Sequence, residues 1–253
     1  MTTLRHLTLI TGASRGMGLA MARQLLADGH ELLCISRHTN DELAAQAQAA
    51  GLACEQWAED LARPENAAAR LQGWLQQRGD AGLASLTLIN NAGVIPRIAP
   101  LGEIPARDLA DALRVGLEAP MLLTGAFLHA TARWRCTRKV LNISSGLGRR
   151  AMASQAAYCA SKAGMDHFTR CVALEEAQRA NGAQVCSLAP GVIDTDMQVQ
   201  LRSADASEFP DHEGFVRLKE QGQLTPPDEA AARVLAFLAR PDFGREPVGD
   251  VRS

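Results

Sequence analysis

The fold of this chain is decided by the stretch Thr11-Gly12-Ala13-Ser14-Arg15-Gly16-Met17-Gly18. It follows an apolar run of strand length, residues 7–10, and leads directly into a helix-compatible segment, residues 18–28. Glycines allow a tight turn and a close approach of the backbone to a pyrophosphate, and the free N–H groups at the start of a helix attract the anion. The spacing is G-x-x-x-G-x-G, which differs from the G-x-G-x-x-G of other dinucleotide folds. Taken alone, it also fits an ordinary strand-to-helix turn.

Outside this turn, apolar runs of strand length alternate with Ala-rich segments of helical periodicity. We expect strands at residues 7–10, 31–35, 86–89, 140–143 and 185–188, with weaker ones at 53–57 and 248–251. We expect helices at residues 18–28, 41–50, 64–77, 108–132 and 156–179. This alternation is typical of a parallel sheet between two helical layers, so it predicts one α/β domain over residues 1–253, a Rossmann-type doubly wound sheet. The polar, Pro-containing segment 198–222 breaks the pattern and predicts a substrate loop or lid around residues 195–222.

Bulk composition narrows the possible partners. The chain has 253 residues, 47% of them hydrophobic, and a formal net charge of -2 without a block of like charge, which argues against a nucleic-acid binder. No apolar run approaches the length of a membrane span, and residues 7–10 are too few for the core of a signal peptide. Six scattered cysteines form no C-x-x-C pair, so we expect buried, reduced thiols, a cytoplasmic location and no metal site. The expected partner is a small molecule.

The end of the second expected strand bears on the choice of cofactor. A site that prefers NAD usually has a carboxylate there to bind the ribose 2′-hydroxyl, but this chain has Ser36-Arg37-His38. A guanidinium at this position attracts the 2′-phosphate of NADP, and Arg15 offers a second positive group. The sequence therefore favours NADP(H), with Asp41 or Glu42 contacting the sugar as the alternative.

A tyrosine, a lysine and a serine are candidates for proton chemistry. Tyr158 is the only tyrosine, and Lys162 lies four residues later on the same face of an expected helix. We expect the ammonium of Lys162 to stabilise the phenolate and make Tyr158 a usable general acid. Ser144 and Ser145 follow the strand at 140–143, at the sheet edge where such folds bind ligands, and either hydroxyl can hold a substrate oxygen.

These residues, in this order, resemble the short-chain dehydrogenase/reductase family over nearly the whole chain. The resemblance rests on the glycine turn, Asn90-Asn91-Ala92-Gly93, Tyr158-x-x-x-Lys162, and Pro190-Gly191 leading to Thr195. The family places its serine 13 residues before its tyrosine, which selects Ser145. It thus implies hydride transfer between a nicotinamide and a carbonyl carbon, with Ser145, Tyr158 and Lys162 as catalytic residues.

The resemblance also implies the residues that bind cofactor and substrate. For the cofactor they are Gly12, Ser14, Arg15, Gly16, Met17, Gly18, Arg37, His38, Asp60, Leu61, Asn91, Ala92, Gly93, Tyr158, Lys162, Pro190, Gly191, Ile193 and Thr195. For the substrate they are Ser145, Gly146, Tyr158, Gly191 and Asp250. Other interpretations stay open, since Asp60 can cap the helix near Pro64 and residues 90–93 can be a simple strand-ending turn.

The segments Asp194-Thr195-Asp196-Met197-Gln198 and Leu218-Lys219-Glu220-Gln221-Gly222-Gln223-Leu224 are similar to those of the sepiapterin reductase and benzil reductase branch. This likeness implies NADPH-dependent reduction of a diketone or of an α-oxo or pterin-type carbonyl, with Asp250 near the position that anchors a pterin. Alternatives within the family are another ketone or alcohol, such as an acyl thioester, a steroid or a sugar. The family also usually forms homodimers or tetramers through helices that match 108–132 and 156–179.

One position departs from the family. Where members carry an asparagine in a Val-Asn-Leu context, which holds a water of the proton relay, this chain has Val115-Gly116-Leu117. Glycine has no side-chain hydrogen bond to offer, so the relay is impaired or rebuilt with water or backbone. This departure motivates a second hypothesis, a non-catalytic NADP-binding sensor. We also expect a kink at Pro120.

Overall fold

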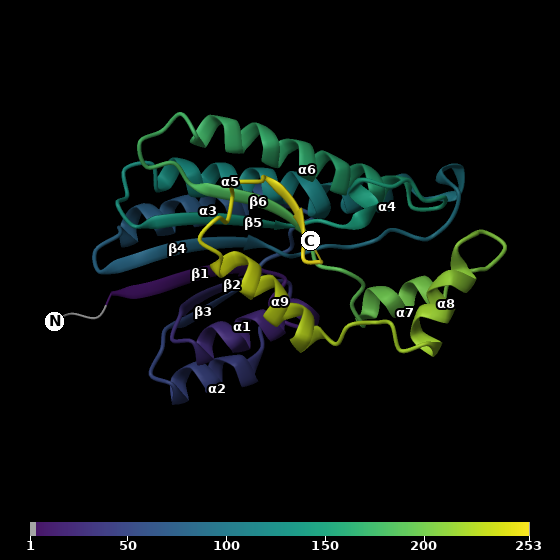
Figure 1. Cartoon of the computed structure of the whole chain (residues 1–253), viewed down its shortest axis with the longest axis horizontal. Coiled ribbons are helices and arrows are strands. Elements are labelled where there is room, and N and C mark those ends of the chain that lie inside the picture. The colour runs from purple at the N-terminus through teal and green to yellow at the C-terminus, as the bar shows by residue number, and fades with distance from the viewer. Residues whose placement is uncertain (1–3, 253) are drawn as a thin grey trace.

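A single parallel sheet organises the chain. The structure, a computed structural model, describes residues 4–252, and its seven strands lie in the order β3-β2-β1-β4-β5-β6-β7 (Figure 1). The strands are β1 (Arg5–Thr11), β2 (Glu31–Ser36), β3 (Cys54–Ala58), β4 (Leu83–Asn90), β5 (Thr137–Ile143), β6 (Gln184–Ala189) and β7 (Val248–Asp250). The predicted α/β class is confirmed, and each expected strand is present.

Helices cover both faces of the sheet (Figure 1). They are α1 (Gly16–Ala27), α2 (Asp41–Ala49), α3 (Pro64–Arg78), α4 (Ala106–Leu113), α5 (Ala119–Ala130), α6 (Ala156–Glu176), α7 (Asp196–Arg202), α8 (His212–Glu220) and α9 (Pro227–Ala239). Side chains from α3, α5 and α6 pack on one face, and side chains from α1, α2 and α9 pack on the other. None of the helices within residues 4–252 is long and apolar enough to cross a membrane.

Strand register explains why both faces need a helical layer. Leu33, Leu9, Leu88, Val140 and Val185 lie side by side across five strands and belong to the core beneath α3, α5 and α6. The residue after each of them points to the opposite face, because side chains alternate along a strand. That second row belongs to the core beneath α1, α2 and α9. A sheet with two apolar faces is stable only when both are covered.

The strand order places the functional edge. The chain runs outward from β1 through β2 to β3, then returns to the other side of β1 and continues from β4 to β7. The loops that follow β1 and β4 therefore diverge, which leaves a crevice at the carboxyl ends of these strands. The glycine turn follows β1, and Asn91 follows β4, so both border this crevice.

The prediction of one continuous α-helix at residues 108–132 is wrong. It divides into α4 and α5, which are joined by a π-helical turn, Arg114–Glu118. Pro120 accounts for the irregularity, because it has no N–H to offer the carbonyl of Gly116, four residues earlier. The π-helical turn lies just before Pro120, and a kink at that residue stays a prediction.

The segment expected as a polar loop, 198–222, contains most of α7 and all of α8. Both helices lie beyond the carboxyl ends of the strands (Figure 1). Leu201 and Phe209 pack there against Ile95 and Ile98, so the segment has a small core of its own. Helix α9 was not predicted.

The cysteines only partly match the expectation of burial. Cys34, Cys136 and Cys186 are buried, and Cys54 and Cys159 are half-buried. Cys171 is exposed on α6, which contradicts the prediction for that residue.

Candidate active site

The glycine turn after β1 forms a cradle in which Gly12 and Gly18 leave no room for a side chain. Gly12 has a φ of 69°, and a Cβ on Gly18 would lie 2.1 Å from the carbonyl oxygen of Gly12. The Thr11 hydroxyl oxygen accepts hydrogen bonds from the N–H groups of Asn91 and Ala92, each 2.9 Å long, which fixes the turn against the loop after β4. The backbone is thus shaped for close approach of a phosphate group, and these residues fit a dinucleotide.

A cavity of about 1040 Å³ opens at the carboxyl edge of the sheet. Every predicted site residue except Asp250 lines it. Those lining residues are Gly12, Ser14, Arg15, Gly16, Met17, Gly18, Arg37, His38, Asp60, Leu61, Asn91, Ala92, Gly93, Ser145, Gly146, Tyr158, Lys162, Pro190, Gly191, Ile193 and Thr195. The fold therefore gathers residues that lie far apart in sequence, although their individual roles stay predictions.

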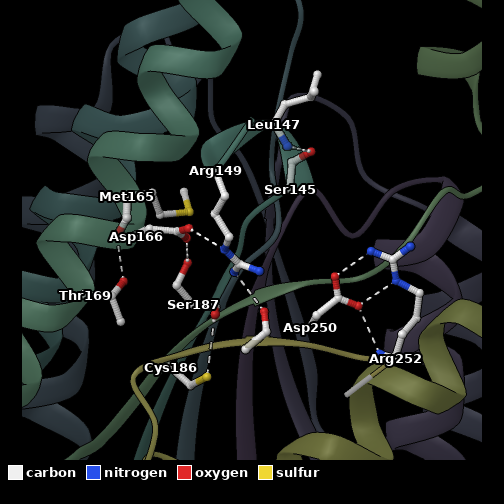
Figure 2. Close-up of polar contacts among 11 residues, drawn as sticks. Ser145, Leu147, Arg149, Met165, Asp166, Thr169, Cys186, Ser187, Asp250 and Arg252 are labelled. Carbon is white, nitrogen blue, oxygen red and sulfur yellow. Dashed lines mark hydrogen bonds and ion pairs between the residues drawn. The ribbon is translucent and has the colours of Figure 1, made fainter. Parts of the chain in front are cut away.

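Ser145 and Tyr158 meet at one end of this cavity. Ser145 follows β5, its Oγ accepts a 3.2 Å hydrogen bond from the N–H of Leu147 (Figure 2), and it lies close to the phenol of Tyr158. Tyr158 lies in the first turn of α6, and Lys162 follows one turn later. The hydroxyl of Ser144 is buried and makes no hydrogen bond to the described residues. Both serines line the cavity, so the choice of Ser145 stays a prediction.

Burial dominates the electrostatics of the tyrosine and the lysine. It raises the pKa of the Tyr158 phenol, and the nearby hydroxyl of Ser145 offsets only part of this shift. Burial also lowers the pKa of Lys162 to about 8, although the charge of Asp166 opposes the change. The Lys162 ammonium donates a 2.7 Å hydrogen bond to the carbonyl of Ile143, and its Nζ lies 5.7 Å from the centroid of the Tyr158 ring.

This result corrects one expectation from the sequence. We expected Lys162 to stabilise the phenolate and so lower the pKa of Tyr158. The pKa is raised instead, because burial destabilises the charged phenolate by more than the neighbouring groups stabilise it.

An ion pair supports α6 beneath Lys162, and no pattern in the sequence indicates it. Asp166 is one helical turn past Lys162, with only 3% of its side chain exposed. It accepts a 3.0 Å hydrogen bond from Arg149 Nε and a 2.6 Å hydrogen bond from the hydroxyl of Ser187 (Figure 2). Arg149 also donates to the carbonyl of Gly249 at 2.9 Å. The pair joins the segment after Ser145, helix α6, strand β6 and strand β7.

The cations expected at the adenosine end of the cavity differ in their surroundings. Arg37 and His38 are exposed after β2 and line the cavity. Arg15 also lines it, but its guanidinium is 2.6 Å from the carboxylate of Asp196 at the start of α7. This ion pair spans the glycine turn and the segment expected to be a lid.

The acidic alternatives for sugar binding lie elsewhere. Asp41 and Glu42 begin α2, outside the lining of the cavity, and Glu42 is paired with Arg23 at 2.7 Å. Asp60 lines the cavity, and its carboxylate accepts from the N–H of Ala62. It therefore closes a local turn and does not cap α3.

Comparison with known proteins agrees with this geometry. A family model described as short chain dehydrogenase matches residues 6–206. The chain belongs to the short-chain dehydrogenase family. It is 34% identical over 243 residues to a benzil reductase ((S)-benzoin forming) of Bacillus cereus, which covers 96% of each chain. It is 32% identical over 248 residues to the sepiapterin reductase of Meriones unguiculatus, covering 93% of this chain and 92% of that one.

Among solved structures, a metagenomic short-chain oxidoreductase in complex with NADP matches with a TM-score of 0.70 and 27% identity, over 99% of this chain and 96% of that one. The predicted family and branch are thus confirmed. As a member of this family, the chain is an oxidoreductase acting on carbonyl or alcohol groups, and its fold binds a nicotinamide dinucleotide.

The position at which this short-chain dehydrogenase lacks the family's asparagine is closely packed. A Cβ on Gly116 would lie 2.9 Å from the hydroxyl oxygen of Ser161. Ser161 in turn donates a 2.8 Å hydrogen bond to the carbonyl of Tyr158. A side-chain hydroxyl therefore lies where the first carbon of an asparagine side chain would begin.

The substrate end of the cavity has an apolar wall that the sequence did not reveal. Ile95, Met152, Met197, Leu201 and Phe215 line it and belong to the same small core as Tyr158. They come from the loop after β4, from the segment before α6 and from α7 and α8. Only the tertiary fold brings these segments together.

Asp250, the predicted anchor of a pterin, lies in β7 and is not among the residues that line the cavity. Arg252 binds its carboxylate through Nε and a terminal nitrogen, both at 2.7 Å (Figure 2). The residue from this segment that lines the cavity is Arg252. A role for Asp250 in substrate binding stays a prediction.

Proposed function

We propose that this chain is an NADPH-dependent carbonyl reductase that converts a diketone, or a related α-oxo carbonyl, to an alcohol with Tyr158 as general acid. One observation carries the proposal. Tyr158, Ser145 and Lys162 line the cavity that begins at the glycine turn, with Ser145 close to the phenol and Lys162 one helical turn after Tyr158. A carbonyl oxygen held by both hydroxyls receives a proton as negative charge develops on it.

Tyr158 and Lys162 have different roles in proton transfer. When bound, the reduced nicotinamide supplies a hydride to the carbonyl carbon. The raised pKa of Tyr158 keeps its phenol protonated at neutral pH, so a proton is available in the reducing direction. Lys162, with a pKa of about 8, is more acidic than this phenol. Its ammonium is therefore the group that restores the proton of Tyr158 after the reaction.

The preference for NADP over NAD rests on Arg37 and His38. Solved structures with this fold hold either NAD or NADP, so the fold alone does not decide the cofactor. Arg37 is exposed beside the cavity, and Glu59, which also lines the cavity, is bound by Arg70 at 2.9 Å. Arg37 makes no ion pair with any residue from 4 to 252, and a guanidinium in this state suits a 2′-phosphate.

The apolar wall supports an aromatic diketone as the substrate. Met152, Met197 and Phe215 offer flexible and aromatic contacts to flat, apolar groups on either side of a reacting carbonyl. A pterin, in contrast, requires polar anchoring, and Asp250 is already bound by Arg252. The diketone is therefore favoured over the pterin.

The experiment is a substrate panel in which the purified chain is given NADPH or NADH with benzil, a pterin carrying an α-oxo side chain, an acyl-thioester ketone, a steroid ketone and a sugar ketone. We expect benzil with NADPH to give the highest kcat/KM. Tight NADPH binding without turnover of any ketone would contradict the proposal and support the non-catalytic sensor. Faster turnover of another ketone class would reassign the substrate.

We also propose that the chain forms a homo-oligomer through α5 and α6. Met121 and Leu122 are exposed on α5, and Leu174 on α6 is 71% exposed. Exposed apolar side chains on α5 and α6 fit helices that a second copy covers. Light scattering after size exclusion should give a dimer or tetramer, and a monomeric mass would refute this proposal.

A further inference from the structure

A buried amide with no partner lies beside the proposed general acid. Gln155 is the last residue before α6, and its carbonyl accepts a 2.8 Å hydrogen bond from the N–H of Cys159. It is 1% exposed and lines the same cavity as Tyr158 and Ser145. Because Gln155 and Tyr158 are three residues apart across the first turn of α6, they lie on the same side of the helix.

The carboxamide of Gln155 makes no hydrogen bond to any residue that the structure describes. This holds for both of its polar atoms, the acceptor Oε1 and the donor Nε2. Buried polar groups in folded proteins are nearly always paired, and an unpaired amide is costly where a leucine or methionine would fill the same volume. An unpaired amide in the wall of a binding cavity is therefore suited to a polar group of the ligand.

The neighbours of Gln155 limit what that polar group can be. Tyr158 and Ser145 are reserved for the reacting oxygen, and the cavity wall near Tyr158 includes the apolar side chains of Ile95, Met152 and Phe215. A substrate with one carbonyl would leave the amide unpaired. A substrate with a second oxygen on the adjacent carbon would pair with it.

We propose that Gln155 recognises the second carbonyl of a vicinal diketone. Its Nε2–H donates to the carbonyl oxygen next to the reacting one, while Tyr158 and Ser145 hold the reacting oxygen. Gln155 takes no part in the proton or hydride transfer, so it determines specificity and orientation. This inference rests on the proposed function, because it requires a reductase that accepts diketones.

The test compares two ketones that share a carbon skeleton. Benzil has two adjacent carbonyls, and deoxybenzoin has only one of them. The substitution Gln155→Met keeps the size of the side chain but removes both hydrogen-bonding atoms. We expect it to lower kcat/KM for benzil by about tenfold, the scale of one lost hydrogen bond, and to leave deoxybenzoin unchanged or faster.

Two controls separate recognition from altered structure. Met152→Leu changes the apolar wall of the same cavity without touching a hydrogen bond, so any change in rate should fall on both ketones alike. The dissociation constant of NADPH for Gln155→Met should match that of the wild type, and the thermal midpoint should be equal or higher, because a costly unpaired amide is removed. Gln155→Asn keeps the amide but shortens its reach, and its ratio of benzil to deoxybenzoin activity should be intermediate.

The outcomes distinguish the inference from the function on which it rests. If the wild type reduces benzil and Gln155→Met keeps the same ratio between the two ketones, the inference is wrong and the function stands. An equal loss on both ketones likewise overturns it, because that result indicates a structural role. If the wild type does not reduce benzil at all, the proposed function fails and the inference fails with it.

Discussion

The ion pair between Asp166 and Arg149 should control the pH dependence of reduction. Asp166 is buried one turn after Lys162, and its negative charge raises the pKa of that lysine against the effect of burial. In our account, reduction needs Lys162 in its ammonium form, so the rate should fall as pH rises through about 8. Asp166→Asn removes the charge, lowers the pKa of Lys162 further and moves this fall in rate to lower pH.

The matched variant Arg149→Met removes the positive charge of the same pair, whereas Asp166→Asn removes the negative one. It removes the cation that balances Asp166, so the uncompensated carboxylate should raise the pKa of Lys162 and move the fall in rate to higher pH. Both variants lose the ion pair and should destabilise the fold. A purely structural role for the pair would move the two pH profiles in the same direction.

The loss of stability can be worked from the exposure of the two side chains. Breaking a fully buried ion pair costs about 3–5 kcal/mol. Asp166 is 3% exposed but Arg149 is 34% exposed, so water compensates part of the loss and about 2 kcal/mol remains. For a chain of this length, that corresponds to a thermal midpoint lower by about 4–8 °C.

The assay is the initial rate of NADPH oxidation with benzil as a function of pH, together with thermal unfolding of the wild type, Asp166→Asn and Arg149→Met. The reasoning is refuted if the profiles of the two variants shift together, or if neither shifts while both proteins are folded. An unchanged thermal midpoint would refute the structural part alone.

Two further predictions concern the cofactor site. Arg37→Ser should weaken NADPH binding about 10–100-fold and leave NADH binding nearly unchanged, because one charge-assisted hydrogen bond to the 2′-phosphate is lost. Fluorescence titration with both cofactors measures this difference. An equal effect on the two cofactors would contradict the assignment of Arg37 to the 2′-phosphate. Gly18→Ala should abolish cofactor binding, since its Cβ would lie 2.1 Å from a main-chain carbonyl oxygen. Gly73→Ala is the matched control, because it adds a Cβ to α3 with nothing within 4 Å and should stabilise the fold by about 0.5–1 kcal/mol. Retained NADPH affinity in Gly18→Ala would refute the role of the cradle.

Much of the fold and of the site follows from local sequence. The cradle from Thr11 to Gly18 depends on glycines a few residues apart, and Tyr158 and Lys162 lie one helical turn from each other, so short-range patterns suffice to find them. The core strands are apolar on both faces, and their runs stand out for the same reason.

The remaining features depend on contacts that no local pattern encodes. Arg149 is 17 residues from Asp166 and 100 from Gly249, and nothing in the sequence links them. The pKa of Tyr158 could not be predicted from its spacing to Lys162, because desolvation depends on all the packed surroundings and not on the neighbouring lysine alone. The unpaired amide of Gln155 is visible only once all its neighbours are placed.

Hydride transfer in a single turnover of the variant Tyr158→Phe tests the central claim most directly. With NADPH bound to saturation and benzil mixed in rapidly, we predict that nicotinamide oxidation slows by roughly 10²-fold or more, the scale of lost general-acid catalysis. The dissociation constant of NADPH should stay close to that of the wild type, since phenylalanine keeps the aromatic ring and removes only the hydroxyl. A single-turnover rate equal to that of the wild type would contradict the claim that Tyr158 delivers the proton.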